Sequence, residues 1–567
     1  MNQDNNTFTS FISRYSITCS IFAMASKLSS ADVEVVHDDE FKGHAHHAEA
    51  SAATAREHQL SFRDSLRLYP KAIGFSLLFS TAIIMEGYDL ALIGSFYGYQ
   101  PFRNKYGNES DGEGGKVVSA DWQTYIQVGG MCGQIIGLYL NGWVSDAIGY
   151  KRSMILSQML MIAFIFIVFF AKNIEMILAG QILLGIPWGV FQTLTLAYAS
   201  DVAPVVLRPY LTAYVNLCWV IGQLISAGVL RGFLNMDSEW SYRIPFAIQW
   251  VWPPFIILGT LFAPESPWWL VRQGRHADAK QAILKLVSPK PDLEFDADAQ
   301  VAMIHATNEL EKATSAGTNY WHCFMRTDLR RTEIASITYI AQATCGSVLM
   351  GYSVQFYERA GLDPNSSFTL NIVQYAVGAV GVILSWFLMA KLGRRTLYIG
   401  GTCVLFIILI VVGGLGFADS SKPGPSWAIG SLLIFYTFIY DMAVGPVCYT
   451  IVAEIPSTRL KAKTIVLARN FNNMAGLVNN TLMPRMLGVN SWNWGAKTGL
   501  FWAAFCLLIM IWAYFRLPEP KGRTYGELDV LFEHKVSARK FATTRVDQFG
   551  DDKGALGYGG LAELVTR

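Results

Sequence analysis

Long apolar blocks, separated by short polar breaks, run through the chain from about residue 70 to residue 517. The blocks reach or approach the ~18 residues or more that a helix needs to cross the hydrocarbon core of a bilayer. None alternates with a period of two, so backbone hydrogen bonds are expected within helices rather than in a closed barrel. The pattern therefore predicts an all-α membrane protein with twelve transmembrane helices. They are expected over residues 72–97, 122–143, 153–170, 174–199, 211–230, 244–262, 334–357, 368–389, 398–417, 427–452, 464–483 and 496–515.

The polar breaks group the twelve blocks into two sets of six, with a charged segment of about 70 residues between them. Such a repeat is the ground plan of many secondary transporters, whose site lies between the two halves. The segment between the halves is expected to form short amphipathic helices. The N-terminal tail, and the polar residues from about Glu533 onward, are predicted to have no fold of their own. The predicted regions are a cytoplasmic N-terminal tail (1–70), a six-helix half (71–262), a cytoplasmic linker (263–333), a second six-helix half (334–517) and a cytoplasmic C-terminal tail (518–567).

The composition excludes several classes of protein. Only 16% of the 567 residues are charged and 52% are hydrophobic, whereas an ordinary soluble domain has about 25% charged residues. A soluble multi-domain enzyme is therefore disfavoured, and a net charge of +2 leaves no basic footprint for a nucleic-acid partner. The eight cysteines form no C-x-x-C pair and the nine histidines lie outside the apolar blocks. The sequence accordingly predicts no metal site and no cofactor.

Lysine and arginine concentrate in the segments that follow the even-numbered blocks. The segment between the sixth and seventh blocks holds nine of them, whereas Lys172 and Lys422 are alone in the loops after the third and ninth blocks. By the positive-inside rule, the basic segments and both termini are expected to face the cytoplasm. Asn108 and Asn365 begin N-x-S sequences in loops on the other side. They are predicted glycosylation sites of a multi-pass plasma-membrane protein.

A glycine-containing basic motif occurs at equivalent places in both halves. It reads GWVSDAIGYKR at residues 142–152, after the second block, and KLGRR at residues 391–395, after the eighth. Glycine lets two helices approach closely, and the basic residues then lie near acidic residues that could hold a gate. Anchoring by positive charge alone is the alternative, but the repeated placement favours a cytoplasmic gate. Its predicted members are Asp146, Lys151, Arg152, Asp201, Arg208, Glu265, Arg394, Arg395, Glu454 and Arg459.

Two further motifs point to a family. PESP at residues 264–267 and PEPKGRT at residues 518–524 resemble the signatures of the sugar porter family of the major facilitator superfamily, with Pro520 in place of a threonine. EGYD at residues 86–89, GIPWG at residues 185–189 and LARN at residues 467–470 are similar to the fungal maltose permeases, which are α-glucoside:proton symporters. The resemblance implies the major facilitator fold with two six-helix halves. It also implies a transporter rather than an enzyme, taking up an α-glucoside such as maltose with protons by alternating access.

Acidic side chains inside a membrane helix are costly and functional by default. Glu86 and Asp89 lie three residues apart in the first block and so share one helix face. The resemblance implies that they couple proton movement to transport together with Arg469 of the eleventh block. Asp441 of the tenth block is a further intramembrane acid, for which coupling and a structural role both stay open. The resemblance also implies that four side chains contact the sugar, namely Gln223, Gln342, Tyr449 and Asn473.

The chain departs from the family pattern at one position that bears on coupling. Gln134 stands where maltose-type symporters tend to have a glutamate, so a facilitative uniporter stays open. A transporter of a polyol-like compound or a secondary metabolite, and a sugar sensor that does not transport, also stay open. The expected partners are a small-molecule sugar, the proton and the lipid bilayer.

Overall fold

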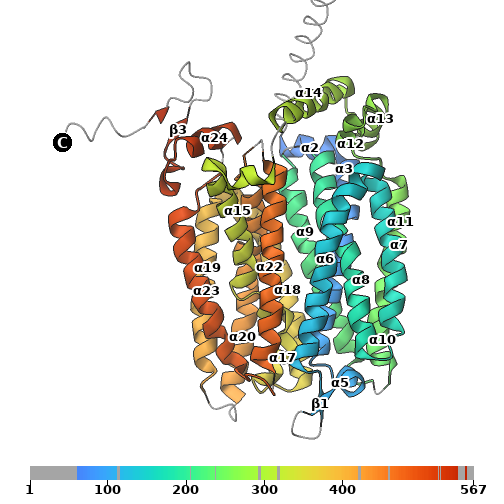
Figure 1. The fold of residues 1–567 in the computed structure, drawn as a ribbon, viewed down its shortest axis with the longest axis vertical. Coiled ribbons are helices and arrows are strands. Elements are labelled where there is room, and N and C mark those ends of the chain that lie inside the picture. Colours follow the sequence, from blue (N-terminus) through green and yellow to red (C-terminus); the bar gives the residue numbers. More distant parts are fainter. Residues whose placement is uncertain are drawn as a thin grey trace, which may run out of the picture.

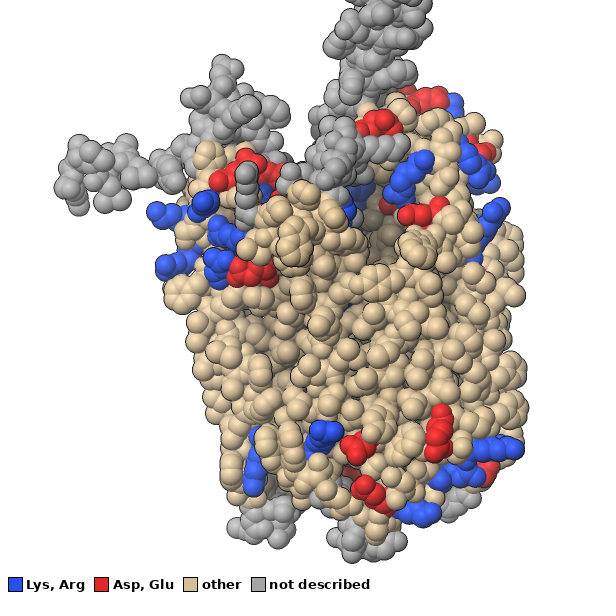
Figure 2. Space-filling model, viewed as in Figure 1, with Lys and Arg blue, Asp and Glu red and all other residues tan. Residues whose placement is uncertain are grey.

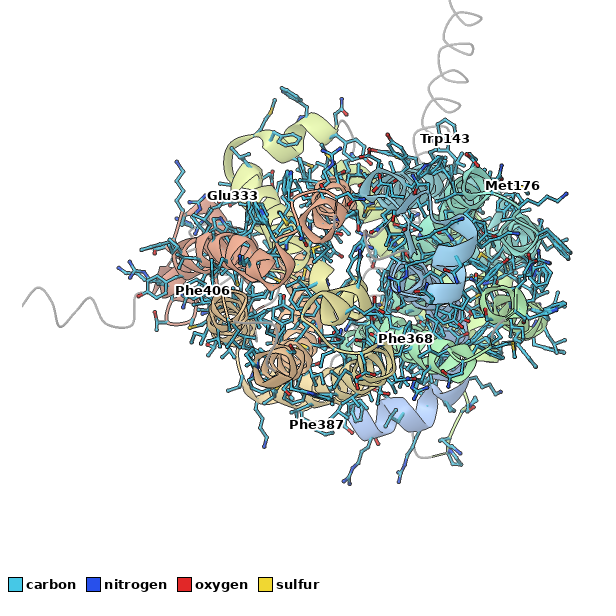
Figure 3. The ribbon with its side chains drawn as sticks, turned by 90° about the horizontal axis from the view of Figure 1, so that it is seen from below. Trp143, Met176, Glu333, Phe368, Phe387 and Phe406 are labelled. Carbon is cyan, nitrogen blue, oxygen red and sulfur yellow. The ribbon has the colours of Figure 1, made fainter. Side chains whose placement is uncertain are left out.

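The computed structural model describes residues 61–110, 115–204, 206–236, 238–291, 295–315, 319–418, 423–457, 460–488, 490–521, 523, 525–546 and 556–557. Most of these residues are helical, and the helices form an upright bundle (Figure 1). Figure 3 looks along the bundle from below and shows two groups of helices side by side. Blue to green helices form the first half, and yellow to red helices form the second.

The first half contains the first six expected blocks. The first block is split at Thr81 into two helices, and the sixth is interrupted by a short 3-10 turn. The elements are α3 (Pro70–Ser80), α4 (Ala82–Phe96), α6 (Ala120–Ile148), α7 (Tyr150–Phe169), α8 (Ile174–Val202), α9 (Arg208–Phe233), α10 (Trp240–Ile248), η1 (Gln249–Val251) and α11 (Trp252–Phe262).

The second half contains the other six blocks, and the seventh and tenth are interrupted. The elements are α15 (Arg326–Thr344), α16 (Val348–Gly351), α17 (Ser353–Arg359), α18 (Pro364–Lys391), α19 (Arg394–Leu415), α20 (Pro423–Ile439), the π-helix η3 (Tyr440–Val444), α21 (Gly445–Glu454), α22 (Lys461–Leu487), η4 (Gly495–Lys497) and α23 (Thr498–Arg516).

All twelve expected blocks are helical, which confirms the predicted fold class. Ten of the spans in the described part of the chain are long and apolar enough to cross a membrane by length and composition. The other two, α6 and α22, have 29 and 27 residues. Both are more polar than the other spans, and Asn470 and Asn480 of α22 contact Tyr139 and Met131 of α6. Figure 2 shows the charged side chains gathered at both ends of the bundle, with an uncharged belt between them.

The two ends of the bundle carry different elements (Figure 1). At the linker end lie α2 (Phe62–Leu68), α12 (Pro267–Arg272), α13 (His276–Leu286), α14 (Ala297–Ser315) and η2 (Tyr320–Phe324). At the opposite end, the loop end, lie α5 (Gln100–Tyr106) and the antiparallel strands β1 (Glu109–Ser110) and β2 (Lys116–Val117). Helix α2 falls within the region assigned above to the N-terminal tail. Residues 1–60 of that tail lie outside the described residues.

The chain after the last span folds further than the sequence predicted. It forms α24 (Tyr525–Glu533) and η5 (Ala538–Lys540), and β3 (Arg545–Val546) pairs with β4 (Leu556–Gly557). Phe532 and Phe541 are 1% and 0% exposed, and the Arg331 guanidinium lies 4.4 Å from the Phe532 ring centroid. The expectation of no fold from Glu533 onward is therefore wrong up to Val546. Two aromatic side chains supply the buried surface that the polar composition concealed.

Glycines bring α6 and α8 into backbone contact. A Cβ at Gly133 or Gly137 would lie 2.1 Å from the carbonyl oxygen of Ile182 or Ile186 on α8. Conversely, a Cβ at Gly189 would lie 2.2 Å from the carbonyl oxygen of Gln134 on α6. Only glycine permits such an approach, so these positions determine how close the polar side chains of α6 and α8 come to α4.

Candidate functional site

Glu86 is fully buried on α4 and lies at the centre of a polar cluster. Its Oε1 accepts hydrogen bonds from Gln134 Nε2 on α6, at 3.1 Å, and from Gln192 Nε2 on α8, at 2.5 Å. Its Oε2 is also buried but has no hydrogen-bond partner among the described residues. A buried anionic oxygen without a donor is costly. The arrangement thus leaves one oxygen of the carboxyl group suited to carry a proton.

Arg469 on α22 reaches this cluster from the second half. Its Nε donates to Gln192 Oε1 at 3.3 Å, and its guanidinium lies 5.6 Å from the ring centroid of Tyr339 on α15. The two residues that the resemblance pairs for coupling, Glu86 and Arg469, are therefore joined through Gln192. The side chain of Arg469 points into the bundle, so it does not reach back to the linker end.

Asp89 lies one helical turn after Glu86 but has a separate environment. Its two oxygens accept hydrogen bonds from Gln181 on α8, at 2.9 Å, and from Gln249 in η1, at 2.5 Å. All three side chains belong to the first half and all are buried. Asp89 has a donor for each oxygen, whereas Glu86 has two donors on one oxygen and none on the other. The structure thus separates two acids that the sequence treats alike.

Three of the four predicted sugar contacts lie near Arg469 in the second half. Gln342 on α15 donates to the carbonyl oxygen of Gly445 at 3.3 Å. The Tyr449 ring packs edge-on against Tyr339, with 5.8 Å between centroids. Asn473 is 2% exposed, and its Nδ2 has no hydrogen-bond partner among the described residues. These side chains could supply amide donors and acceptors and an aromatic ring to a polyhydroxylated ligand.

The fourth predicted contact, Gln223, lies on α9 of the first half. It follows Gly222, where a Cβ would come 2.1 Å from the carbonyl oxygen of Ile84 on α4. Helix α9 therefore packs closely against the helix that bears Glu86. Gln223 is half-buried, and no hydrogen bond in the described structure joins it to the other three.

Two breaks in the second half lie beside these residues. The seventh span is interrupted at Gly346, whose φ of +100° suits glycine. Asn479 of α22 donates to the carbonyl oxygen of Ala343 at 2.7 Å, and Tyr436 donates to that of Cys345 at 2.8 Å. The tenth span passes through η3 just before Pro446, which lacks an N–H group. The step at Gly445 and Pro446 is thus preceded by one turn of π-helix.

Asp441, the unassigned intramembrane acid, lies in η3 and is 5% exposed. A Cβ at Gly378 of α18 would lie 2.6 Å from its Oδ2, so the absent side chain of Gly378 makes room for it. Asp441 belongs to a different contact, between η3 and α18. The structure places it outside the cluster around Glu86.

At the linker end, two glutamates perform the same task in the two halves. Glu265 Oε1 accepts from the backbone N–H groups of Tyr150, at 2.9 Å, and Lys151, at 3.2 Å. Glu519 accepts from those of Arg394, at 2.8 Å, and Arg395, at 3.0 Å. Both carboxylates thus satisfy donors at the start of a helix, where negative charge is favoured. Burial raises the pKa of Glu265 above its usual value of 4.5.

The other predicted gate residues bind within their own half. Arg394 pairs with Glu454 at 3.1 Å, and Asp201 accepts from Ser266 Oγ at 2.6 Å. Three basic side chains donate to backbone carbonyl oxygens: Lys151 to Leu261, Arg208 to Ala203 and Arg395 to Tyr514. The backbone carbonyl oxygen of Asp146 accepts a hydrogen bond from the indole N–H of Trp269. The side chain of Arg152 makes no hydrogen bond or ion pair with the described residues, and Arg459 lies outside them.

The halves meet in polar contacts at the loop end. Arg103 pairs with Glu358 at 3.6 Å, and Arg485 pairs with Asp121 at 3.6 Å. A Cβ at Gly94 of α4 would lie 2.1 Å from the carbonyl oxygen of Gly351 in α16. The loop end is therefore closed in this structure.

Both predicted glycosylation sites lie at this end. Asn365 is exposed in the first turn of α18. Asn108 is also exposed, but its Nδ2 donates to Ser119 Oγ at 3.1 Å. A glycan on Asn108 Nδ2 would change this hydrogen bond to Ser119.

Three residues of these contacts were not predicted from the sequence: Gln192 beside Glu86, Gln249 beside Asp89, and Glu519 of the PEPKGRT motif at the linker end. One signal was present: Gln181 and Gln192 lie eleven residues apart in an apolar block, about three helical turns, and so share a face. Two amides on one face of a membrane helix mark a polar contact.

Comparison with known proteins matches the chain to a family of sugar transporters and to sugar permeases. The profile of the family described as "Sugar (and other) transporter" matches residues 75–532. The chain is 40% identical over 520 residues to "General alpha-glucoside permease" of Saccharomyces cerevisiae (strain ATCC 204508 / S288c), covering 91% of this chain and 83% of that one. It is 42% identical over 511 residues to "Maltose permease MAL31" of the same strain, covering 89% and 83%.

Solved structures show the same architecture. The proton:xylose symporter XylE bound to 6-bromo-6-deoxy-D-glucose has a TM-score of 0.67 and 20% identity, covering 82% of this chain and 99% of that one. A partially occluded inward-open conformation of XylE from E. coli has a TM-score of 0.65 and 18% identity, covering 80% and 100%. These likenesses show the twelve-helix major facilitator fold.

Proposed function

The chain belongs to the sugar (and other) transporter family, and we propose that it takes up an α-glucoside such as maltose together with protons by alternating access. The substrate class is supported by 40% identity to a general α-glucoside permease over 91% of the chain. The observation that carries the coupling is the buried Glu86, whose Oε2 lacks a donor while its Oε1 is linked through Gln192 to Arg469. A carboxyl group so placed can bind a proton at the contact between the halves.

The closed loop end supports the assignment of this structure to the state of the transport cycle that is closed on the outer side. Positive charge at the linker end favours a cytoplasmic position for that end and for both termini in the plasma membrane. The ion pair between Arg103 and Glu358 then closes the outer side. In the alternate state, with the outer side open, Glu86 would take up a proton from external water. After the halves move to the state described here, the proton would leave to cytoplasmic water.

The sugar site would lie between the halves, beside Arg469. Gln342 and Asn473 would exchange hydrogen bonds with sugar hydroxyls, and Tyr449 would cover an apolar face of the ring. Gln223 would contact the sugar from the first half. The unpartnered Nδ2 of Asn473 supports this placement, because a hydroxyl oxygen would satisfy it. The breaks at Gly346 and η3 would let the neighbouring backbone move as the site opens and closes.

The cytoplasmic gate would be built on Glu265 and Glu519. Each holds the start of a basic helix in its own half, and the basic residues there would meet the acidic ones of the other half when the inner side closes. Asn108 and Asn365 would carry glycans on the outer side.

Transport of a panel of labelled sugars, with pH recording, tests this function in a host that lacks its own sugar transporters. We expect maltose to accumulate and to alkalinise the medium. Glu86→Gln should abolish accumulation while retaining exchange of labelled for unlabelled maltose, because exchange needs no net proton movement. Failure to transport any α-glucoside would refute the substrate class.

Facilitative uniport is the second candidate, favoured by one observation. Gln134 is neutral and donates to Glu86 at a position where an acid would offer a second proton site. Maltose uptake with no alkalinisation of the medium, and with no accumulation, would establish this alternative.

A further inference from the structure

Gln192 is the side chain through which the two halves are joined at Glu86. It lies on α8, it is 7% exposed, and its amide touches a carboxylate of the first half and a guanidinium of the second. We propose that Gln192 is a positioning residue that transmits the charge state of Glu86 to Arg469, and so makes the contact between the halves depend on the proton. This inference rests on the proposed proton-coupled transport.

The orientation of the Gln192 amide follows from chemistry. An ionised carboxylate only accepts hydrogen bonds and a guanidinium only donates them. The NH₂ group of Gln192 must therefore face Glu86 and its carbonyl oxygen must face Arg469, as the structure shows. In this orientation the amide dipole lies between a negative and a positive group and stabilises both.

Protonation of Glu86 removes the reason for this orientation. The proton adds to Oε2, which has no donor, and it is taken from water and returned to water. The hydrogen bond from Gln192 then loses its charge assistance, which contributes roughly half of the strength of such a bond. Arg469 in turn loses an acceptor held in place by the negative charge. The link between the halves is thus strong with Glu86 ionised and weak with Glu86 neutral.

The groups around Glu86 leave Gln192 as the route for this signal. Helix α6 presents Gln134, which donates to Glu86 and makes no hydrogen bond to the described residues of the second half. Helix α9 approaches α4 through the backbone of Trp219 beside Gly87. The charged or titratable groups that face the cluster from the second half are Arg469, Tyr339, Tyr449 and Cys448. Asp89 on α4 is bound to Gln181 and Gln249 instead.

A matched pair of variants tests the proposal. Gln192→Met removes the amide that touches both halves and keeps an unbranched side chain of similar size. Gln134→Met removes the other amide that donates to the same oxygen and leaves the contact to Arg469 intact. Full-length protein in liposomes is assayed for protons moved per maltose, for accumulation, for exchange at zero gradient, and for the pH profile of each.

Both variants take one donor from Glu86, so both should shift the pH profile. Only Gln192→Met should uncouple transport, with protons per maltose falling about 5-fold or more, the lower range of coupling between two sites. Gln192→Met should still exchange labelled for unlabelled maltose, which would show that the variant is folded. In a Glu86→Gln background, Gln192→Met should no longer change the pH profile, because no charge remains to be transmitted.

Three results would overturn the proposal. Gln192→Met with an unchanged ratio of protons to maltose shows that the amide does not transmit the signal. Equal uncoupling by Gln134→Met shows that only the loss of a donor to Glu86 matters. Loss of exchange by Gln192→Met, with the same loss by Gln192→Asn, shows that the complete glutamine side chain is required for the fold rather than for transmitting the charge state. If the unaltered protein moves maltose without protons, the proposed symport is wrong. The role proposed for Gln192 is then wrong as well, because it rests on symport.

Discussion

Arg103 on α5 forms an ion pair with Glu358 on α17, with 3.6 Å between nitrogen and oxygen, and so joins the two halves at the loop end. The side chains are only 15% and 14% exposed, which limits screening by solvent. Near this pair, Gly94 and Gly351 bring the helix backbones of the two halves into contact. The closed loop end therefore depends in part on this partly buried charge pair and on the absence of a side chain at Gly94.

Removing the charge of Glu358 should favour opening of the loop end. For Glu358→Gln we expect a loss of about 1 kcal/mol, or an approximately fivefold shift toward the state open at that end. The readout is the rate at which an impermeant thiol reagent modifies a cysteine placed at Gln355, which lines the cavity between the halves there. The swap Arg103→Glu with Glu358→Arg should restore the slow rate. An unchanged rate in Glu358→Gln would show that the pair does not hold the loop end closed.

Glu265 should make stability depend on pH with a defined sign. Burial raises the pKa of Glu265 above its usual value of 4.5, so the folded protein binds this proton more tightly than the unfolded chain. Stability from this group is then fully present below pH 4.5 and is lost as the pH rises through the raised pKa. The stability of the unaltered protein relative to Glu265→Gln should therefore increase as the pH falls from about 7.5 to about 5. Thermal unfolding in detergent measures it, and a decrease over this range would contradict the assignment.

The close packing of α6 on α8 should not tolerate even one methyl group. In Gly189→Ala the new Cβ would lie 2.2 Å from the carbonyl oxygen of Gln134, so one helix must move. Overpacking of this kind costs about 1–3 kcal/mol, and the shift would also carry Gln134 away from Glu86. We expect a lower unfolding temperature and weaker coupling of protons to transport. Gly142→Ala, on the partner helix α6 with nothing within 4 Å of the added Cβ, is the control and should behave like the unaltered protein.

The segment after the last span should contribute to the stability of the second half. Phe541 is fully buried and packs on Phe532, with 5.1 Å between ring centroids. Phe541→Ala should lower stability by about 3–5 kcal/mol, as is usual for a buried aromatic side chain. Phe417→Ala, at a position that is 68% exposed, is the control and should have little effect in detergent. Equal unfolding temperatures for the two variants would show that the segment does not pack as described.

Much of the architecture could be predicted because a bilayer imposes strict rules on sequence. Backbone groups must be satisfied within helices, so apolar length identifies the spans, including α6 and α22, which are more polar than the rest. The helix breaks at Gly346 and before Pro446 lie at residue types that favour them, because glycine adopts a positive φ and proline has no N–H group to donate. The fold of the segment from Glu533 to Val546 was not predicted. It depends on the packing of Phe532 and Phe541 against each other and against Arg330 and Arg331, which are distant in the sequence.

The order of residues along the chain is enough to show which side chains are polar within the spans and which of them share a helix face. It placed Glu86 and Asp89 on one face, and the resemblance of LARN pointed to Arg469. The packing of the helices is needed to show that Asp89 has a donor on each oxygen and that Glu86 has none on Oε2 among the described residues. It also shows that Gln192 lies between Glu86 and Arg469. Helical periodicity gives the direction of a side chain relative to its own helix. Which helix lies opposite depends on close packing between glycines far apart in the chain, and no local pattern carries that information.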